Sequence, residues 1–251
     1  MSLFDPSPKL RWLFCWTHPD DELALACWIR RLTHAGADVF LSWTHSTQER
    51  EQEARSAAET LGVPQDRLFF HGSADGKVID DIPRLLSRFE VMIGDCKPDR
   101  VVCAAFEQGH LDHDATNLVV NAAFDGPVFE TPLYHTYAQP IPVVNKFACP
   151  DGQEVYPLSE EEASFKRRLA NQYPSQHIRD LLIWYGIWAR LRFEPFSIDT
   201  RELLRIQTYR DFLTPNLPPR LTLRVLKTGL WRRWHEAIRG LDLSRRVKPQ
   251  P

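Results

Sequence analysis

Two short segments of the sequence concentrate side chains that bind metals and transfer protons. One is THPDDE at residues 17–22, and the other is GHLDHD at residues 109–114. Each holds two metal-binding residue types three positions apart, which can turn toward one point where the chain enters a helix. These pairs are His18 with Asp21 and His110 with His113.

A catalytic zinc site typically has three His or carboxylate ligands and one open position for water. The two segments can supply such a set as His18, Asp21 and His113. Metal-activated hydrolysis also needs a base beside the metal-bound water and a hydrogen-bonding group beside the developing oxyanion. The residues that remain for these roles are Asp20, His110 and Asp112.

Each segment also has an ordinary structural explanation. Acidic residues at a helix start are favoured by the helix dipole and by capping, and a single His-x-x-His pair is common on protein surfaces. Neither segment alone would establish a site. The two together, each directly after a predicted strand, favour a metal-dependent hydrolase.

The elements around the two segments place both at one edge of a sheet. Strands are predicted at 10–17, 39–44, 67–70, 100–106 and 128–134, and helices at 21–34, about 46–60, 82–93 and 114–124. This alternation is typical of an α/β fold with a mostly parallel sheet flanked by helices. Such folds bind ligands at the carboxyl ends of their strands, where both segments would lie.

The composition is that of an ordinary globular protein. The 251 residues are 43% hydrophobic and 25% charged, with a net charge of -2. The longest apolar run, 181–189, is shorter than the roughly 20 residues that cross a bilayer, and no signal peptide is recognisable, so we expect a cytoplasmic protein. The five cysteines form no CxxC pair, which argues against a disulfide framework. Motifs for dinucleotide binding and for a serine nucleophile are missing, and we expect a small-molecule substrate and no nucleic-acid partner.

The two segments and several other residues resemble a known family, the PIG-L/LmbE-like deacetylases. HPDDE at 18–22 resembles the family's hallmark, and HLDH at 110–113 resembles its second motif. Further similar positions are Arg50, Glu53, Ala57, Leu61 and Gly62, then Asp75-Gly76, Lys166, Ser175, Gln176 and Glu194-Pro195-Phe196. The resemblance covers about residues 9–196.

The resemblance implies a Rossmann-like hydrolase that removes an N-acetyl group from an N-acetylglucosamine-type amino sugar or its conjugate. It implies zinc, or iron(II) or another divalent ion, as the metal. It also implies roles for single residues: metal ligands His18, Asp21 and His113, general base Asp20, oxyanion stabiliser and acid His110, and Asp112 to orient His110. Arg50 and Asp75 match positions that bind sugar hydroxyls.

Some positions depart from the family pattern. The second strand ends in Thr44-His45-Ser46-Thr47 where the family commonly has Thr-x-Gly, so the loop that shapes the substrate pocket differs. Gln108 stands where some members carry a tyrosine that helps to polarise the carbonyl. Two alternatives stay open: an amidase that cleaves a larger N-acyl or thiol conjugate, and a carbohydrate- or lipid-binding protein without turnover.

The resemblance predicts a deacetylase domain over residues 1–197 and a helical, basic C-terminal extension over 198–251. Residues 220–251 carry nine Lys and Arg against two acidic residues, a net charge of +7, while the remainder has 22 against 31, a net charge of -9. We favour helices docked on the acidic body through an apolar stripe that includes Trp231 and Trp234. The alternative is peripheral contact with a membrane or glycolipid. The sequence leaves the oligomeric state open.

Overall fold

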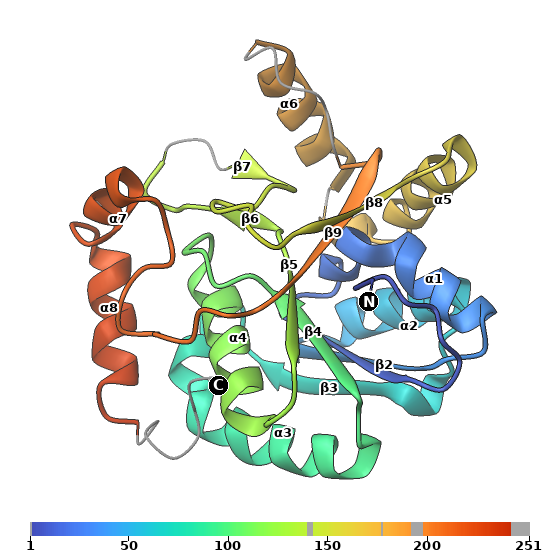
Figure 1. Cartoon of the computed structure of the whole chain (residues 1–251), viewed down its shortest axis with the longest axis horizontal. Coiled ribbons are helices and arrows are strands. Elements are labelled where there is room, and N and C mark those ends of the chain that lie inside the picture. The colour runs from blue at the N-terminus through green and yellow to red at the C-terminus, as the bar shows by residue number, and fades with distance from the viewer. Residues whose placement is uncertain (1, 140–142, 177, 192–197, 242–251) are drawn as a thin grey trace.

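The computed structural model describes residues 2–139, 143–176, 178–191 and 198–241 (Figure 1). Its main sheet has seven strands in the order β3-β2-β1-β4-β5-β9-β8. The first five in this order are parallel and comprise β1 (Arg11–Trp16), β2 (Asp38–His45), β3 (Leu68–Ser73), β4 (Arg100–Ala104) and β5 (Val128–Thr131). Two antiparallel strands extend it, β9 (Arg201–Ile206) and β8 (Glu154–Pro157). The predicted mostly parallel α/β fold is confirmed.

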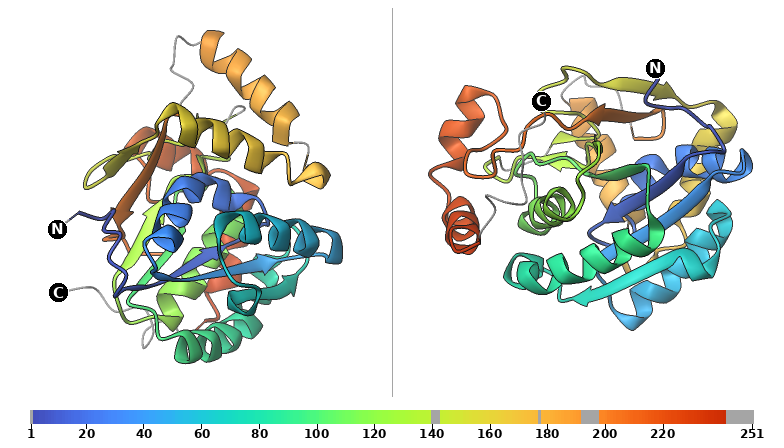
Figure 2. Two further views of the ribbon diagram at one scale, coloured as in Figure 1. Left: turned by 90° about the vertical axis from the view of Figure 1, so that its right-hand side faces the viewer. Right: turned by 60° about the horizontal axis from the view of Figure 1, so that its bottom comes forward.

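Helices cover both faces of the sheet, as the two views of Figure 2 show. Alternate residues of β1 point to opposite faces: Trp12, Phe14 and Trp16 belong to one core cluster, and Leu13 and Cys15 to the other. The first cluster includes residues of α1 (Ala26–His34), α2 (Gln48–Leu61) and α5 (Glu160–Ala170). The second includes residues of α3 (Ile82–Cys96), α4 (Leu111–Ala123), α7 (Pro219–Val225) and α8 (Gly229–Ile238).

The remaining elements are shorter or lie outside these layers. A two-stranded sheet pairs β6 (Tyr134–His135) with β7 (Val143–Val144). The short 3-10 turns are η1 (Asp21–Leu25), η2 (Gln65–Arg67), η3 (Val78–Asp81) and η4 (Pro174–Gln176). Helix α6 (Ile178–Leu191) projects from the body in Figure 1. None of the described helices is long and apolar enough to cross a membrane.

Several element boundaries differ from the prediction for identifiable reasons. The expected helix 21–34 begins as the 3-10 turn η1 and becomes α-helical only from Ala26. Helix α4 begins at Leu111, three residues before the predicted start, because the side chain of His110 caps it. Strand 128–134 divides into β5 and β6. The strands β8 and β9 were not predicted. The S-x-x-E spacing of Ser159 and Glu162 in the sequence predicts a helix cap, and these residues form a complete capping box at the start of α5.

The C-terminal helices pack on the body. Trp231 and Trp234 are 6% and 0% exposed, and the indole N–H of Trp234 donates to the carbonyl oxygen of Phe212 at 2.8 Å. The predicted docking of this apolar stripe is therefore confirmed for α7 and α8. The domain boundary after residue 197 remains a prediction; β9, which follows it, lies inside the main sheet. The expected Glu194-Pro195-Phe196 motif lies outside the described residues.

Candidate metal centre and active site

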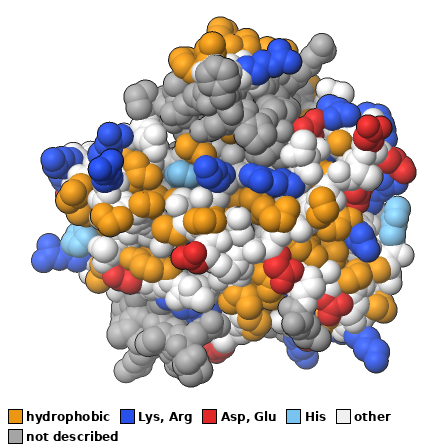
Figure 3. All heavy atoms as spheres, turned by 45° about the horizontal axis from the view of Figure 1, so that its top comes forward, with side chains coloured by type: hydrophobic (Ala, Val, Ile, Leu, Met, Phe, Trp, Pro, Cys, Tyr) orange, Lys and Arg blue, Asp and Glu red, His pale blue; other side chains and the backbone are white. Residues whose placement is uncertain are grey.

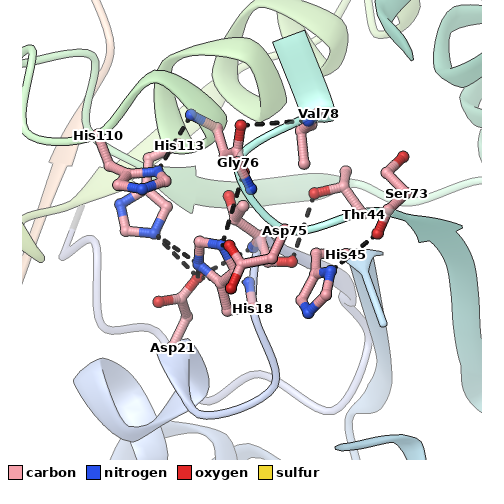
Figure 4. Close-up of polar contacts among 12 residues, drawn as sticks. His18, Asp21, Thr44, His45, Ser73, Asp75, Gly76, Val78, His110 and His113 are labelled. Carbon is pink, nitrogen blue, oxygen red and sulfur yellow. Dashed lines mark hydrogen bonds and ion pairs between the residues drawn. The ribbon is translucent and has the colours of Figure 1, made fainter. Parts of the chain in front are cut away.

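The candidate site lies where the strand order reverses. Strand β1 pairs with β2 on one side and with β4 on the other, so the chain leaves the carboxyl ends of these strands in opposite directions. Open α/β sheets place their ligands at this crevice. The segment 17–22 follows β1, and 109–114 follows β4, so topology brings the two segments together (Figure 4).

The three expected metal ligands converge in this crevice. Nδ1 of His18 lies 3.2 Å from Nε2 of His113, and Oδ2 of Asp21 lies 3.4 Å from that His113 atom and 3.8 Å from His18 Nδ1. Ligands held about 2.0–2.1 Å from a tetrahedral zinc ion are about 3.3 Å apart. The donor atoms and their spacing therefore fit a single divalent ion.

Backbone amides fix the carboxylate of this set. The N–H groups of Thr17 and His18 both donate to Oδ2 of Asp21, at 3.0 and 2.8 Å. Hydrogen bonds that support a metal-binding carboxylate orient it and restrict its motion. The turn between β1 and η1 therefore shapes the site before any metal binds.

The charge balance of the site favours a cation. Burial lowers the pKa of His18, but the carboxylates of Asp112 and Asp75, followed by that of Asp21, outweigh burial and raise the pKa to about 10. Burial would raise the pKa of Asp21, yet His113 and His18 hold it well below its usual value. A divalent ion would take the place of the proton that these carboxylates hold on His18.

Asp20, the predicted general base, lies beside the ligand set on a strained backbone. Its φ is 127°, a region that residues other than glycine seldom adopt, and its N–H donates to Oε2 of Glu22 at 3.0 Å. Burial and then the charge of Asp21 raise the pKa of Asp20 well above its usual value, against the opposing charge of Arg50. A raised pKa makes this carboxylate a better proton acceptor near neutral pH.

Glu22, the last residue of the HPDDE motif, is buried and supports the turn. Its carboxylate accepts hydrogen bonds from the hydroxyl of Tyr173, from the indole N–H of Trp43 at 3.2 Å and from the N–H of Asp20. This carboxylate therefore connects the strained residue to β2 and to the segment after α5. These contacts give Glu22 a structural role within the motif.

His110 is positioned by the start of α4. Its Nδ1 accepts the backbone N–H of Asp112 at 3.2 Å, the N-cap interaction of this helix. A neutral ring that accepts through Nδ1 carries its proton on Nε2. Burial, followed by the charges of His113 and His18, lowers the pKa of His110 to about 4. The ring is therefore neutral near pH 7 and can donate a hydrogen bond through Nε2.

Asp112 contacts the opposite wall of the site. Its two carboxylate oxygens accept the backbone N–H groups of Gly76 at 2.7 Å and of Val78 at 3.1 Å, and Oδ2 lies 3.8 Å from Nε2 of His18. Asp112 therefore contacts the ring of His110 through its backbone N–H. The side chain of Asp112 instead holds the loop that carries Asp75.

The two expected sugar-binding residues face each other across the crevice. Nη1 of Arg50 lies 4.0 Å from Oδ2 of Asp75, and Nη2 lies 3.8 Å from Oδ1 of Asp20. Nη2 also donates to the side-chain carbonyl of Gln176. The side chain of Asp75 is 64% exposed, so a substrate can reach it.

Other residues that resemble the family pattern form hydrogen bonds between α2, the end of η1 and the segment that includes α5 and η4. Glu53 accepts the N–H and the hydroxyl of Ser175 at 2.9 and 2.7 Å, next to the contact between Arg50 and Gln176. Lys166 donates to the carbonyl oxygen of Ala24 at 3.2 Å, directly before α1. Helix α2, which carries Arg50 and Glu53, and the segment with Lys166, Ser175 and Gln176 therefore hold each other and the HPDDE turn in place.

Sequence reasoning gave little weight to two further residues of the site. His45 is 2% exposed, and its Nδ1 donates a hydrogen bond to the carbonyl oxygen of Ser73 at 2.8 Å. Its ring lies 5.4 Å from that of His18. Tyr134 places its ring 5.0 Å from that of His113. Burial first, and then the carboxylates of the site, raise the pKa of Tyr134 above its usual value, so the phenol keeps its proton. The sequence signals for His45 were its place directly after the predicted strand 39–44, at the same edge of the sheet, and the departure from the family's Thr-x-Gly ending.

Known proteins resemble this chain in sequence and in fold. The family model PIG-L, described as GlcNAc-PI de-N-acetylase, matches residues 13–124. None of the curated proteins compared matches the chain. Three solved structures, each 15% identical to this chain, share the fold. A teicoplanin deacetylase complex has a TM-score of 0.58 and its zinc-inhibited form one of 0.56, and both comparisons cover 78% of this chain and 97% of the other. N,N'-diacetylchitobiose deacetylase from Pyrococcus horikoshii has a TM-score of 0.58, with 82% of this chain and 87% of that chain covered.

The family match covers both segments that carry the candidate metal ligands and the elements between them. Residues 13–124 run from β1 to the end of α4, so they include the HPDDE turn, Arg50, the Asp75 loop and the His-x-x-His pair. The sequence match and the convergence of these residues in space therefore agree. Residues 13–124 therefore match the PIG-L family model, and this match indicates an N-deacetylase, which is an amide hydrolase.

Proposed function

We propose that this protein is a metal-dependent deacetylase that releases acetate from an N-acetylglucosamine-type amino sugar or its conjugate. The observation that carries the proposal is the convergence of His18 Nδ1, Asp21 Oδ2 and His113 Nε2 beside the partly buried carboxylate of Asp20, whose pKa is raised. A divalent ion held by these three atoms would activate a water molecule and polarise the acetyl carbonyl.

In the proposed mechanism, Asp20 takes a proton from the water that attacks the carbonyl carbon. His110 donates a hydrogen bond from Nε2 to the developing oxyanion, since its Nδ1 is engaged by the helix cap. The C–N bond then breaks, the amine leaves with a proton from the site, and the acetyl group leaves as acetate. Arg50 and Asp75, which face each other above the site, would bind hydroxyl groups of the sugar.

The first experiment measures metal content and acetate release on the same preparations. Purified protein, reconstituted with zinc or iron(II), would be compared with His113→Ala and with the control His34→Ala, whose side chain is exposed outside the site. We expect about one metal per chain for the native protein and the control, and a loss in His113→Ala. Acetate and free amine should appear with a panel of N-acetylglucosamine conjugates.

Other outcomes would select the alternatives. Release of a longer acid in place of acetate would favour the amidase that cleaves a larger N-acyl or thiol conjugate. Negligible metal that neither ion restores would contradict the hydrolase and favour a carbohydrate- or lipid-binding protein. The zinc-inhibited form of the teicoplanin deacetylase makes it important to test more than one metal and more than one ratio of metal to protein.

A further inference from the structure

Large exposed apolar side chains are concentrated in two segments. Of the twelve such side chains among the described residues, nine lie in α6 or between residues 213 and 230. They are Ile183, Trp184, Ile187, Trp188, Leu191, Leu213, Leu223, Leu226 and Leu230. Single exposed apolar residues are normal on a protein surface, but a clustered set marks a site of interaction.

Five of these residues form one face of α6, which we call the α6 apolar face. The spacing of Ile183, Trp184, Ile187, Trp188 and Leu191 puts them on one side of the helix. The helical spacing of these tryptophans in the sequence favours core packing over a sugar or lipid site. Trp184 is 64% exposed and Trp188 is 42% exposed, so core packing is wrong for both. Tryptophan is a preferred residue at the boundary between water and lipid.

The second segment combines leucines with unpaired cations, and we call it the basic leucine surface. Leu223, Leu226 and Leu230 alternate along α7 and the start of α8 with exposed cations, which are Arg220, Arg224, Lys227 and Arg232. No acidic residue occurs between positions 212 and 235. Within the described part of the chain, these four cations form no salt bridge.

Both surfaces lie on the side of the molecule that carries the candidate site. Strands β4 and β5 run toward the upper part of Figure 1, where β6, β7, α6 and α7 also lie. Figure 3 shows this side of the molecule: hydrophobic and basic side chains lie together at its top, toward α6, and at its left edge, toward α7 and α8. A flat partner could therefore contact both surfaces while facing the site.

We propose that the α6 apolar face and the basic leucine surface together bind the surface of an anionic lipid bilayer. The unpaired cations match the negative potential of such a surface, and the tryptophans and leucines would enter the interface between headgroups and acyl chains. A second copy that docked symmetrically through the basic leucine surface would bring the same cations together, and these would repel. The residues that enter the bilayer are therefore not the buried Trp231 and Trp234 but Trp184, Trp188 and the leucines of α7 and α8.

Vesicle binding without substrate tests this proposal independently of the proposed activity. The native chain would be sedimented with vesicles of phosphatidylcholine alone and with vesicles that also contain phosphatidylglycerol. We expect binding to the anionic vesicles, loss of at least about tenfold in partition coefficient for R220E/R224E/K227E, and a similar weakening at high salt. W184S/W188S should also lose binding, together with the blue shift of tryptophan emission that the native chain shows on vesicles.

Control variants separate this contact from general effects of charge or hydrophobicity. Val91→Ser changes a residue that is 66% exposed on α3, far from α6 in Figure 1, and Lys9→Glu reverses another exposed charge. Both should bind as the native chain does. Equal binding of the native chain and R220E/R224E/K227E to anionic vesicles would overturn the proposal. The proposal would also be overturned if the native chain were a dimer that did not bind vesicles and W184S/W188S were a monomer. The α6 apolar face would then bind a second copy of the chain.

Discussion

Nε2 of His18 faces the carboxylate of Asp112, 3.8 Å away, while Nδ1 on the other side of the same ring faces His113 at 3.2 Å. A second carboxylate oxygen, from Asp75, lies 3.3 Å from Nε2. Carboxylates on this side favour the tautomer with hydrogen on Nε2, which leaves the Nδ1 lone pair for a metal. Asp112, which holds the loop at Gly76, and Asp75, which lies in that loop, thus both orient the ring of this candidate ligand.

We predict that Asp112→Asn weakens metal binding by about 10- to 100-fold, the usual range for loss of a residue that supports a ligand. The amide also cannot accept hydrogen bonds from Gly76 and Val78 with both of its atoms. Competition with a chelator measures the affinity, and Asp95→Asn, on an exposed position of α3, is the control. An unchanged metal dissociation constant would contradict this role.

We predict that Asp20→Asn keeps the metal and loses turnover. Asparagine tolerates positive φ about as well as aspartate does, so the turn should fold, but the amide cannot take a proton. We expect kcat to fall by about 100- to 10,000-fold. The measurement pairs acetate release with metal content, and native turnover in a fully loaded variant would remove Asp20 from the mechanism.

We predict that Glu22→Gln destabilises the fold by about 1–3 kcal/mol, because the amide NH2 group would face hydrogen-bond donors in a buried position. Tyr173→Phe removes only one donor and should cost less. Urea unfolding measures both changes, with the exposed Glu59→Gln as the control. A Glu22→Gln variant as stable as the control would show that the network is dispensable.

We predict that Gly109→Ala disturbs the wall of the site. A Cβ atom at this position would overlap the backbone carbonyl oxygen of Tyr134, so that segment must move away from His113. We expect a loss of stability of about 1–3 kcal/mol and reduced turnover. The matched control is Gly94→Ala in α3, where a Cβ atom meets open space and should stabilise the helix by about 0.5–1 kcal/mol. Thermal unfolding compares the two, and equal effects would argue against the close approach.

We predict that His71 makes the stability of the fold depend on pH. Burial, followed by the charges of Arg88 and Arg84, lowers the pKa of His71 from 6.5 to about 4. The unfolded chain then binds a proton that the folded chain rejects, so stability is full above about pH 6.5 and falls as the pH drops toward 4. The loss of stability between about pH 6.5 and pH 4 should be smaller in His71→Gln than in the exposed control His34→Gln. Parallel curves of unfolding free energy against pH for the two variants would contradict the assignment.

The sequence by itself determined the two pairs of candidate ligands, the α/β class and the edge of the sheet at which these pairs lie. These are local properties: the spacing of His18 and Asp21 or of His110 and His113 sets what can point one way at a helix start. The periodicity of apolar residues predicts the alternation of strands and helices. Because alternating helices connect parallel strands, the carboxyl ends of these strands lie at one edge of the sheet, where ligands bind. For the same reason the capping box at Ser159 and Glu162 could be predicted residue by residue.

Only the tertiary structure decided which distant residues meet. The contacts of Asp112 with Gly76, of Glu22 with Tyr173 and of Tyr134 with His113 join segments whose separation along the chain carries no signal of contact. Exposure was decided in the same way. Trp184 and Trp234 both lie on apolar helix faces, yet one is exposed and the other buried, because only α8 has a neighbouring surface to cover it. Periodicity shows that a helix has an apolar face, and the rest of the fold determines what that face meets.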